Sequence, residues 1–210
     1  MYKKKFYFIV FEGVEGTGKS YQINKLYKNL IKANYKVSKT REPGGCHTAE
    51  KIRKLIFDKN SNQFHKLIEF YLILAARNEH IQKTIIPSKN KKIILISDRF
   101  VDSTFAYQII GNKINKKINL LNQKYILKKI KPNITIVLKS DIKTIGKRLR
   151  KRGKSNRFDK LKANFYKKAQ KTYVRIANKD KSRYFVFDSS ENTRFLEDKI
   201  FKLVLRKLKN

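Results

Sequence analysis

Residues 13–20 read Gly-Val-Glu-Gly-Thr-Gly-Lys-Ser, and this stretch constrains the fold more than any other. It matches G-x-x-x-x-G-K-[ST], the pattern of a P-loop, in which backbone N–H groups surround phosphate oxygens. The apolar run 6–12 before it predicts a buried parallel strand, and the helical spacing of apolar residues in 21–31 predicts a helix after it. The chain must therefore build a sheet that presents this loop to a ligand.

The loop predicts a nucleoside triphosphate site with a magnesium ion. Lys19 is placed to reach the outer phosphates, and the Ser20 hydroxyl is placed to hold Mg²⁺. The ATP-binding residues predicted in this way are Gly13, Val14, Glu15, Gly16, Thr17, Gly18, Lys19 and Ser20.

Strands and helices alternate along the rest of the chain. Strand-like runs cover 35–40, 93–97, 134–138 and 184–187. Helical patterns cover 50–57, 64–86 (closed by Pro87), 118–130, a segment from about 141, 158–178 and 195–208. We therefore expect an α/β, three-layer P-loop NTPase fold, in which a five-stranded parallel sheet is flanked by helices within a single domain, 1–210.

The composition bears on where the protein is found and on whether it contains disulfides or a histidine metal site. The lysines before the first strand superficially resemble the start of a signal peptide, but the apolar run that follows is short and ends at Glu12. No apolar run approaches the roughly 20 residues of a membrane helix, so we expect a cytoplasmic protein without membrane contact. The single cysteine, Cys46, excludes an intrachain disulfide, and the three histidines lack the spacing of metal ligands.

The net charge of +36 is typical of a nucleic-acid-binding protein. Its lysines, however, are scattered along the whole chain beside many Asn and Ile residues, and A/T-rich codons specify all three. We therefore attribute much of the charge to genome composition, and we expect salt-sensitive adsorption to RNA but no specific nucleic-acid site. A basic nucleic-acid-binding protein with a vestigial P-loop is the alternative from a different class.

Asp98 and Arg99 directly follow the predicted strand 93–97. Ligands of open α/β sheets bind at the carboxyl ends of the strands, so Asp98 can approach the same magnesium ion as Ser20. An ordinary helix cap and a surface charge are the alternative interpretation.

The P-loop alone does not separate GTPases, motor ATPases and small-molecule kinases. A GTPase needs a guanine-reading Asn-Lys-x-Asp after a strand, whereas Lys139-Ser140-Asp141 follows strand 134–138 here. The basic run that begins at Arg148 is either a solvated face or a short lid, about 148–160, that bends at Gly153 and closes arginines over the triphosphate. A lid of this kind suits a kinase that acts on a small substrate.

Four stretches together resemble bacterial thymidylate kinases: residues 11–20, 40–45 (Thr-Arg-Glu-Pro-Gly-Gly), 75–77 (Ala-Ala-Arg) and 98–108 (Asp-Arg-Phe-Val-Asp-Ser-Thr-Phe-Ala-Tyr-Gln). The resemblance implies a homodimer that uses Mg²⁺ and transfers the γ-phosphoryl group of ATP to deoxythymidine monophosphate (dTMP). The acceptor is already an anionic phosphate oxygen, so no protein base is needed, and cations must instead converge on the phosphates.

The resemblance also implies roles for individual residues. Glu15 would accept a hydrogen bond from the sugar 3′-hydroxyl, Arg77 would donate to a thymine carbonyl, and Tyr107 would crowd the sugar 2′ position against ribonucleotides. Arg41 and Arg99 would approach the monophosphate. The substrate-binding residues implied are Glu15, Arg41, Pro43, Ile73, Arg77, Arg99, Ser103, Thr104, Tyr107 and Gln108, and the metal-binding residues are Ser20 and Asp98, the latter through water.

In bacterial enzymes of this kind, lid arginines supply a charge that eukaryotic relatives carry in the P-loop, at the position of Gly16 here. The catalytic residues implied are Lys19, Arg99, Arg152 and Arg157.

Three residues depart from the family pattern: Cys46 replaces a Thr, Asn156 an Asp, and Ile73 a Phe that stacks on thymine. Loss of that stack is expected to weaken base binding by about 0.5–1.5 kcal/mol, with Phe70, one turn earlier, compensating in part. Ile73 also keeps open the alternative of a kinase for another nucleotide or for a deoxynucleoside.

Overall fold

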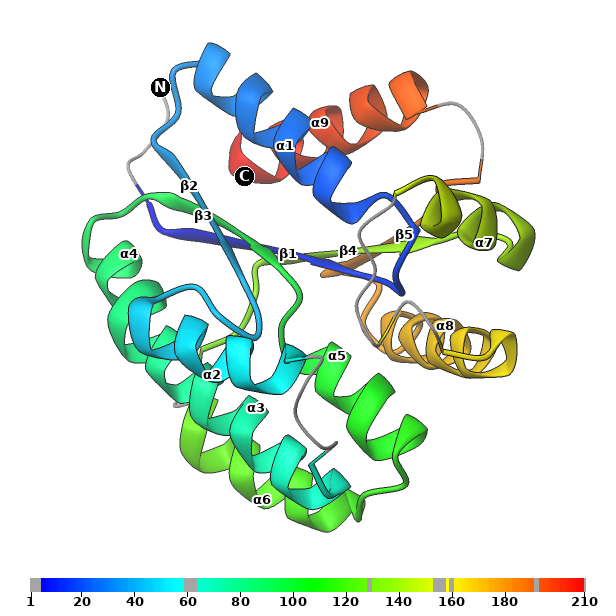
Figure 1. Ribbon diagram of the computed structural model, residues 1–210. Helices are drawn as coiled ribbons and strands as arrows, with labels where there is room; N and C mark the ends of the chain where they lie inside the picture. Colours follow the sequence, from blue (N-terminus) through cyan, green and yellow to red (C-terminus); the bar gives the residue numbers. More distant parts are fainter. Residues whose placement is uncertain are drawn as a thin grey trace.

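The computed structural model describes residues 5–58, 64–127, 130–152, 158, 161–190 and 193–209 (Figure 1). Its strands are β1 (Tyr7–Glu12), β2 (Val37–Arg41), β3 (Ile94–Asp98), β4 (Ile134–Lys139) and β5 (Tyr184–Asp188). Its α-helices are α1 (Lys19–Lys32), α2 (His47–Phe57), α3 (Lys66–His80), α4 (Ile86–Asn90), α5 (Val101–Thr104), α6 (Lys116–Leu127), α7 (Ile142–Lys151), α8 (Ala163–Ala177) and α9 (Thr193–Lys209). Two π-helical segments are η1 (Ile81–Ile85) and η2 (Phe105–Gly111).

In the described part of the chain the strands form one five-stranded parallel sheet in the order β2-β3-β1-β4-β5. The central strand β1 is apolar on both faces because helices cover both of them. The register pairs Phe11 and Arg41 with Asp98, so β1, β2 and β3 end side by side. The predicted α/β fold class is confirmed, and its strand ends form one continuous edge.

The two faces of the sheet bury different residues of the same strands. Ile9 and Phe11 of β1 pack against α1 and α9, through residues such as Leu26 and Ile200. The alternate residues of β1 face the opposite layer, which contains α3, η1, α6 and α8 (Figure 1). Each such buried side chain contributes about 1.5–3 kcal/mol of hydrophobic stabilisation, so the core holds the strand ends rigidly.

The prediction that Pro87 closes the helix over 64–86 was wrong. The helical backbone runs from α3 through η1 into α4 and ends at Asn90. Pro87 lies in the first turn of α4, immediately after the π-helical turn. The proline follows a π-helical turn in which the Ile86 N–H already bonds to the Ile81 carbonyl, so the regular α-helical hydrogen-bond pattern is interrupted where the proline N–H is missing.

Other differences lie at element ends. The helix predicted over 158–178 begins at Ala163, and the helical segment from Val101 to Gly111 was not predicted. Of the predicted lid, the structure describes Arg148 to Arg152 and Phe158, whereas Gly153, Asn156 and Arg157 lie outside the described residues. None of the helices in the described ranges is long and apolar enough to cross a membrane.

Candidate active site

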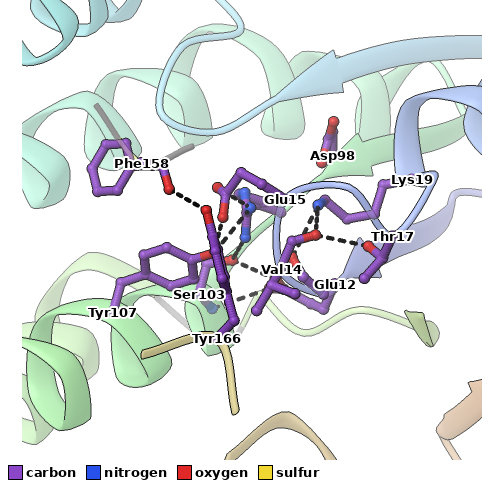
Figure 2. A network of polar contacts seen from close by, with 12 residues as sticks. Glu12, Val14, Glu15, Thr17, Lys19, Asp98, Ser103, Tyr107, Phe158 and Tyr166 are labelled. Carbon is purple, nitrogen blue, oxygen red and sulfur yellow. Dashed lines mark hydrogen bonds and ion pairs between the residues drawn. The ribbon is translucent and has the colours of Figure 1, made fainter. Parts of the chain in front are cut away.

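The P-loop joins the end of β1 to the first turn of α1 (Figure 2). Gly13 has φ 142°, and a Cβ atom there would clash with the Leu138 carbonyl oxygen of β4, so a larger residue does not fit. Gly18 caps α1 in a left-handed conformation, with φ 83°. Thr17 Oγ1 donates to the Val14 carbonyl at 2.7 Å. The loop is thus held in shape by its own hydrogen bond and by the neighbouring strand.

Lys19 is buried inside this loop with its ammonium group against backbone oxygens (Figure 2). Its Nζ donates to the carbonyls of Gly13 at 2.9 Å and Val14 at 3.0 Å. Burial lowers the pKa of Lys19 to about 8, and the positive charge of Arg99 acts in the same direction. Because its hydrogen-bond partners are neutral carbonyls, the ammonium group favours an anionic ligand beside it.

Ser20 and Asp98 bring two oxygen donors together beside the loop. Ser20 Oγ lies 3.3 Å from Asp98 Oδ2, and Asp98 Oδ1 is buried without a hydrogen-bond partner among the described residues. Magnesium is commonly held by one or two protein oxygens together with water and substrate phosphates. The described residues contain no group of three or more His, Cys, Asp or Glu side chains that could bind a metal alone. The donor set therefore fits Mg²⁺ that is shared with a nucleotide.

Arg99 follows β3 with φ 74°, a left-handed conformation that is uncommon for a residue other than glycine. Its guanidinium donates to Glu15 at 2.7 Å, to Ser103 at 2.9 Å and to the Tyr173 hydroxyl at 3.1 Å. The Tyr107 hydroxyl donates to the other oxygen of Glu15 (Figure 2). The Arg99 side chain is only 15% exposed, so it is not a solvated surface charge. Tyr173 was not predicted, and no sequence signal separates it from the other tyrosines.

Glu12, the last residue of β1, ties these elements together. It accepts hydrogen bonds from the Phe100 backbone N–H at 2.9 Å and from Ser103 Oγ at 2.5 Å. Burial raises the pKa of Glu12 to about 8, and the negative charge of Asp102 acts in the same direction. The end of β1 and the start of α5 are therefore fixed relative to each other.

Arg77 of α3 forms the other end of the site and is buried. Its Nε pairs with Glu42 at 2.7 Å, and its Nη2 donates to Thr104 Oγ1 at 2.8 Å and to the Phe100 carbonyl at 3.1 Å. His80 Nδ1 lies 2.9 Å from the second oxygen of Glu42. Among the described residues, Arg77 Nη1 is buried without a hydrogen-bond partner. The guanidinium is thus held in place, and its Nη1 amino group remains available to donate to a ligand.

A cavity of about 390 Å³ joins the P-loop to Arg77. Gly13, Val14 and Thr17 do not line it, because they belong to the inner side of the P-loop. Arg157 lies outside the described residues. The predicted residues that line it are Glu15, Gly16, Gly18, Lys19, Ser20, Arg41, Pro43, Ile73, Arg77, Asp98, Arg99, Ser103, Thr104, Tyr107, Gln108 and Arg152.

Arg53 of α2 also lines the cavity and was not predicted. It donates to the Pro43 carbonyl at 2.7 Å, and its guanidinium lies 4.4 Å from the Phe57 ring centroid. Burial lowers its pKa. The predicted Arg41, by contrast, is more than half exposed and pairs with Glu50 at 2.8 Å. In a chain with 52 lysines and arginines, no sequence signal distinguished Arg53 from its neighbours.

Ile73 lines the cavity, but the expected compensation by Phe70 was wrong. Phe70 is fully buried in a separate cluster with Leu74 and Ile109, and it does not reach the cavity. The stripe of α3 that carries Phe70 faces η2 and α6 instead. Among the described aromatic residues, Phe100 and others such as Phe57 line the cavity in its place.

Comparisons with known proteins identify the family of the chain. Residues 11–200 match the family model described as thymidylate kinase. A thymidylate kinase from Mycoplasma capricolum subsp. capricolum is 38% identical over 204 residues, which are 96% of each chain. One from Pelobacter propionicus is 33% identical, over 95% of this chain and 94% of its own.

A solved structure shows the same fold. The thymidylate kinase from Ehrlichia chaffeensis superposes with a TM-score of 0.77 at 29% identity, over 95% of this chain and 99% of its own. Both the sequence matches and this superposition extend over nearly the whole chain, including the P-loop and the residues around Arg77 and Arg99. The chain belongs to the thymidylate kinase family.

Proposed function

We propose how the cavity is divided between the two substrates of a thymidylate kinase. The enzyme phosphorylates dTMP with ATP as the phosphoryl donor. ATP lies at the P-loop end, the base of dTMP lies at the Arg77 end, and the two phosphates meet beside Arg99. The main observation behind this placement is that one cavity is lined by both the buried Lys19 and the buried Arg77. We place the reaction in the cytoplasm, where ATP-dependent nucleotide synthesis takes place.

The donor end is built to hold a triphosphate. The backbone of residues 13–18 surrounds the phosphates, and Lys19 releases its carbonyl partners to pair with them. Ser20 would hold Mg²⁺ directly and Asp98 would hold it through water. The ion, when bound, neutralises charge that develops on the phosphate oxygens.

The acceptor end is built to place one phosphate oxygen in line with ATP. Arg99 reaches the monophosphate from its hydrogen bond to Glu15, which in turn accepts from the sugar 3′-hydroxyl. We add Arg53 to Arg41 as a second cation on this side, because it is half-buried at the cavity wall. Tyr107 occupies the space that a 2′-hydroxyl would need. No residue has to remove a proton, because the attacking oxygen is already anionic.

Arginines at the mouth of the cavity would supply further positive charge to the substrate phosphates. Arg152 lines the cavity, and Arg148 anchors α7 by donating to the Ser189 carbonyl at 2.7 Å. Closure of this segment over ATP would exclude water, so that ATP is not hydrolysed. The same role for Arg157 stays a prediction from the sequence.

A coupled ADP-release assay tests the proposal. MgATP is offered with dTMP, dUMP, dCMP, dGMP or deoxythymidine, and we expect turnover to be fastest with dTMP. Arg99→Ala should lower kcat by at least about a hundredfold, the scale of losing a charge-stabilising group. Arg175→Ala, which removes an exposed arginine of α8, should not. Full activity of Arg99→Ala would refute the placement of the phosphates.

The expected homodimer would form through α2, α3 and α6. These helices lie on the same side of the sheet and carry exposed apolar side chains (Figure 1). In the described chain, such residues include Leu55, Ile68, Tyr71, Leu120 and Leu121. Sedimentation velocity should give twice the chain mass, and Tyr71→Glu should shift the protein to a monomer. Phe195→Glu, which changes an exposed side chain of α9, is the matched control that should leave the dimer intact.

A further inference from the structure

Gln108 lines the cavity beside Arg77, and a buried glutamate lies behind it. Gln108 belongs to η2 and is 3% exposed. Its Nε2 donates to Glu69 Oε1 at 3.0 Å. Glu69 is 5% exposed and does not line the cavity. Glu69, Ile73 and Arg77 are spaced four residues apart on α3, so they share one face of that helix.

The carboxylate of Glu69 determines which way the Gln108 amide faces. Glu69 Oε1 accepts the hydrogen bond from Gln108 Nε2, so the amide presents its NH₂ group to the glutamate. A carbonyl turned toward the carboxylate would place two acceptor oxygens in contact within a buried site. The Gln108 Oε1 is therefore the atom left for a ligand, and it has no hydrogen-bond partner among the described residues.

The cavity wall thus offers one donor and one acceptor of fixed direction. The donor is Arg77 Nη1, which the Glu42 pair and the Thr104 hydroxyl hold in place. The acceptor is Gln108 Oε1. Thymine and uracil carry a carbonyl oxygen next to a ring N–H, which matches this arrangement. Cytosine carries an amino group next to a bare ring nitrogen, which is the reverse.

We propose that Glu69 is a positioning residue that sets the pyrimidine selectivity of the enzyme. By holding the NH₂ group of Gln108, it keeps an acceptor facing the base and so excludes cytosine. This inference rests on the placement of the acceptor base in the proposed function.

Glu69→Gln tests the inference, because a neutral amide can face Gln108 with either of its ends. The specificity constants kcat/KM for dTMP, dUMP and dCMP are compared at saturating MgATP. We expect the dTMP-to-dCMP ratio to fall about tenfold, mainly through a higher KM for dTMP. The dTMP-to-dUMP ratio should stay unchanged, because these bases share the edge that is read. Glu79→Gln, on the same helix but outside the cavity, should leave both ratios unchanged.

The outcomes separate a failed inference from a failed placement of the base. If Glu69→Gln lowers all three constants equally, or leaves the dTMP-to-dCMP ratio unchanged, the inference is wrong. If Gln108→Leu leaves that ratio unchanged, the base does not lie here and the proposed placement fails. In the Gln108→Leu background, adding Glu69→Gln should change the ratio no further. Should Glu69→Gln unfold, Glu69→Asp, whose shorter side chain cannot reach Gln108, must lower the ratio in its place.

Discussion

At the scale of single residues, we expect Lys19 to make ATP binding sensitive to pH. Its pKa is about 8 in the protein without ligand, because burial disfavours the ammonium group. A phosphate bound beside Lys19 would favour the protonated form and so raise that pKa. As pH rises through about 8, the free enzyme loses this charge, so kcat/KM for ATP should fall toward tenfold per pH unit. The kcat at saturating ATP should hold to a higher pH.

The measurement is a pair of pH profiles for ATP from about pH 6.5 to 10, at saturating dTMP. The test is whether kcat/KM falls at a lower pH than kcat, since unfolding at high pH would lower both quantities together. Coincident profiles, or a kcat/KM that stays level through pH 9, would contradict the role given to Lys19.

Ile73→Phe would place an aromatic ring at the wall of the proposed base site. Ile73 is 7% exposed and borders open cavity, so the larger ring has space to extend toward the base. An aromatic pair contributes about 0.5–1.5 kcal/mol, which should lower the KM for dTMP about two- to twelvefold. The KM for ATP serves as the internal control and should not move. A KM for dTMP that stays level or rises would show that the base does not face Ile73.

Residues in the continuous motifs could be predicted from the sequence, because local spacing determines the P-loop and the turn after β3. Arg53, Tyr173 and Glu69 could not. Tyr173 and Glu69 contact residues far away in the chain, Tyr173 with Arg99 across 74 positions and Glu69 with Gln108 across 39. Arg53 reaches the cavity beside the Pro43 carbonyl, which its spacing on α2 does not indicate. In a chain this rich in lysine, arginine and tyrosine, residue type alone carried no signal for Arg53 or Tyr173.

At the scale of elements, η2 connects the base site to the core. It carries Tyr107 and Gln108 toward the cavity, and its last residue, Gly111, meets α8. A Cβ atom at Gly111 would clash with the ring of Phe165, which itself packs on Tyr107 at 5.3 Å between ring centroids. The close approach of η2 and α8 therefore depends on a glycine.

Gly111→Ala should destabilise the protein by about 1–3 kcal/mol, because the half-buried Phe165 ring must move from its packing against Tyr107. Gly146→Ala is the matched change in α7, where the nearest atom to a new Cβ is Arg150 Nη1 at 3.5 Å. That variant should gain about 0.5–1 kcal/mol, because alanine loses less backbone freedom on folding. Urea unfolding of both variants measures the difference. Equal effects would show that the contact with Phe165 is not tight.

The elements themselves were mostly predictable, since apolar runs and helical spacing located all the strands and most helices. The predicted helices were wrong where tertiary packing overrides local sequence signals. Pro87 reads as a helix end in sequence, yet the π-helical turn η1 lets the backbone continue to Asn90. The segment 101–111 has no clear amphipathic pattern, because the site takes up one of its faces and the core the other.

At the scale of the whole molecule, the charges are distributed unevenly between interior and surface. Two guanidinium groups in the interior are paired at the site, Arg77 with Glu42 and Arg99 with Glu15. The remaining excess, 52 basic against 16 acidic residues, must lie mainly on the surface. Exposed ion pairs such as Lys139 with Asp188 contribute little, at most about 1 kcal/mol each. The folded state therefore carries unrelieved repulsion among like charges.

Because unfolding separates these charges, salt that screens them should stabilise the fold. We expect the melting temperature to rise by several degrees between about 20 and 200 mM NaCl, as the screening length shortens from roughly 20 Å to below 10 Å. Anion binding at the P-loop would also raise it, so Lys19→Ala is measured in parallel. If screening is the cause, the variant shows the same rise. A flat melting temperature in both proteins would mean that the net charge of +36 imposes no cost on folding.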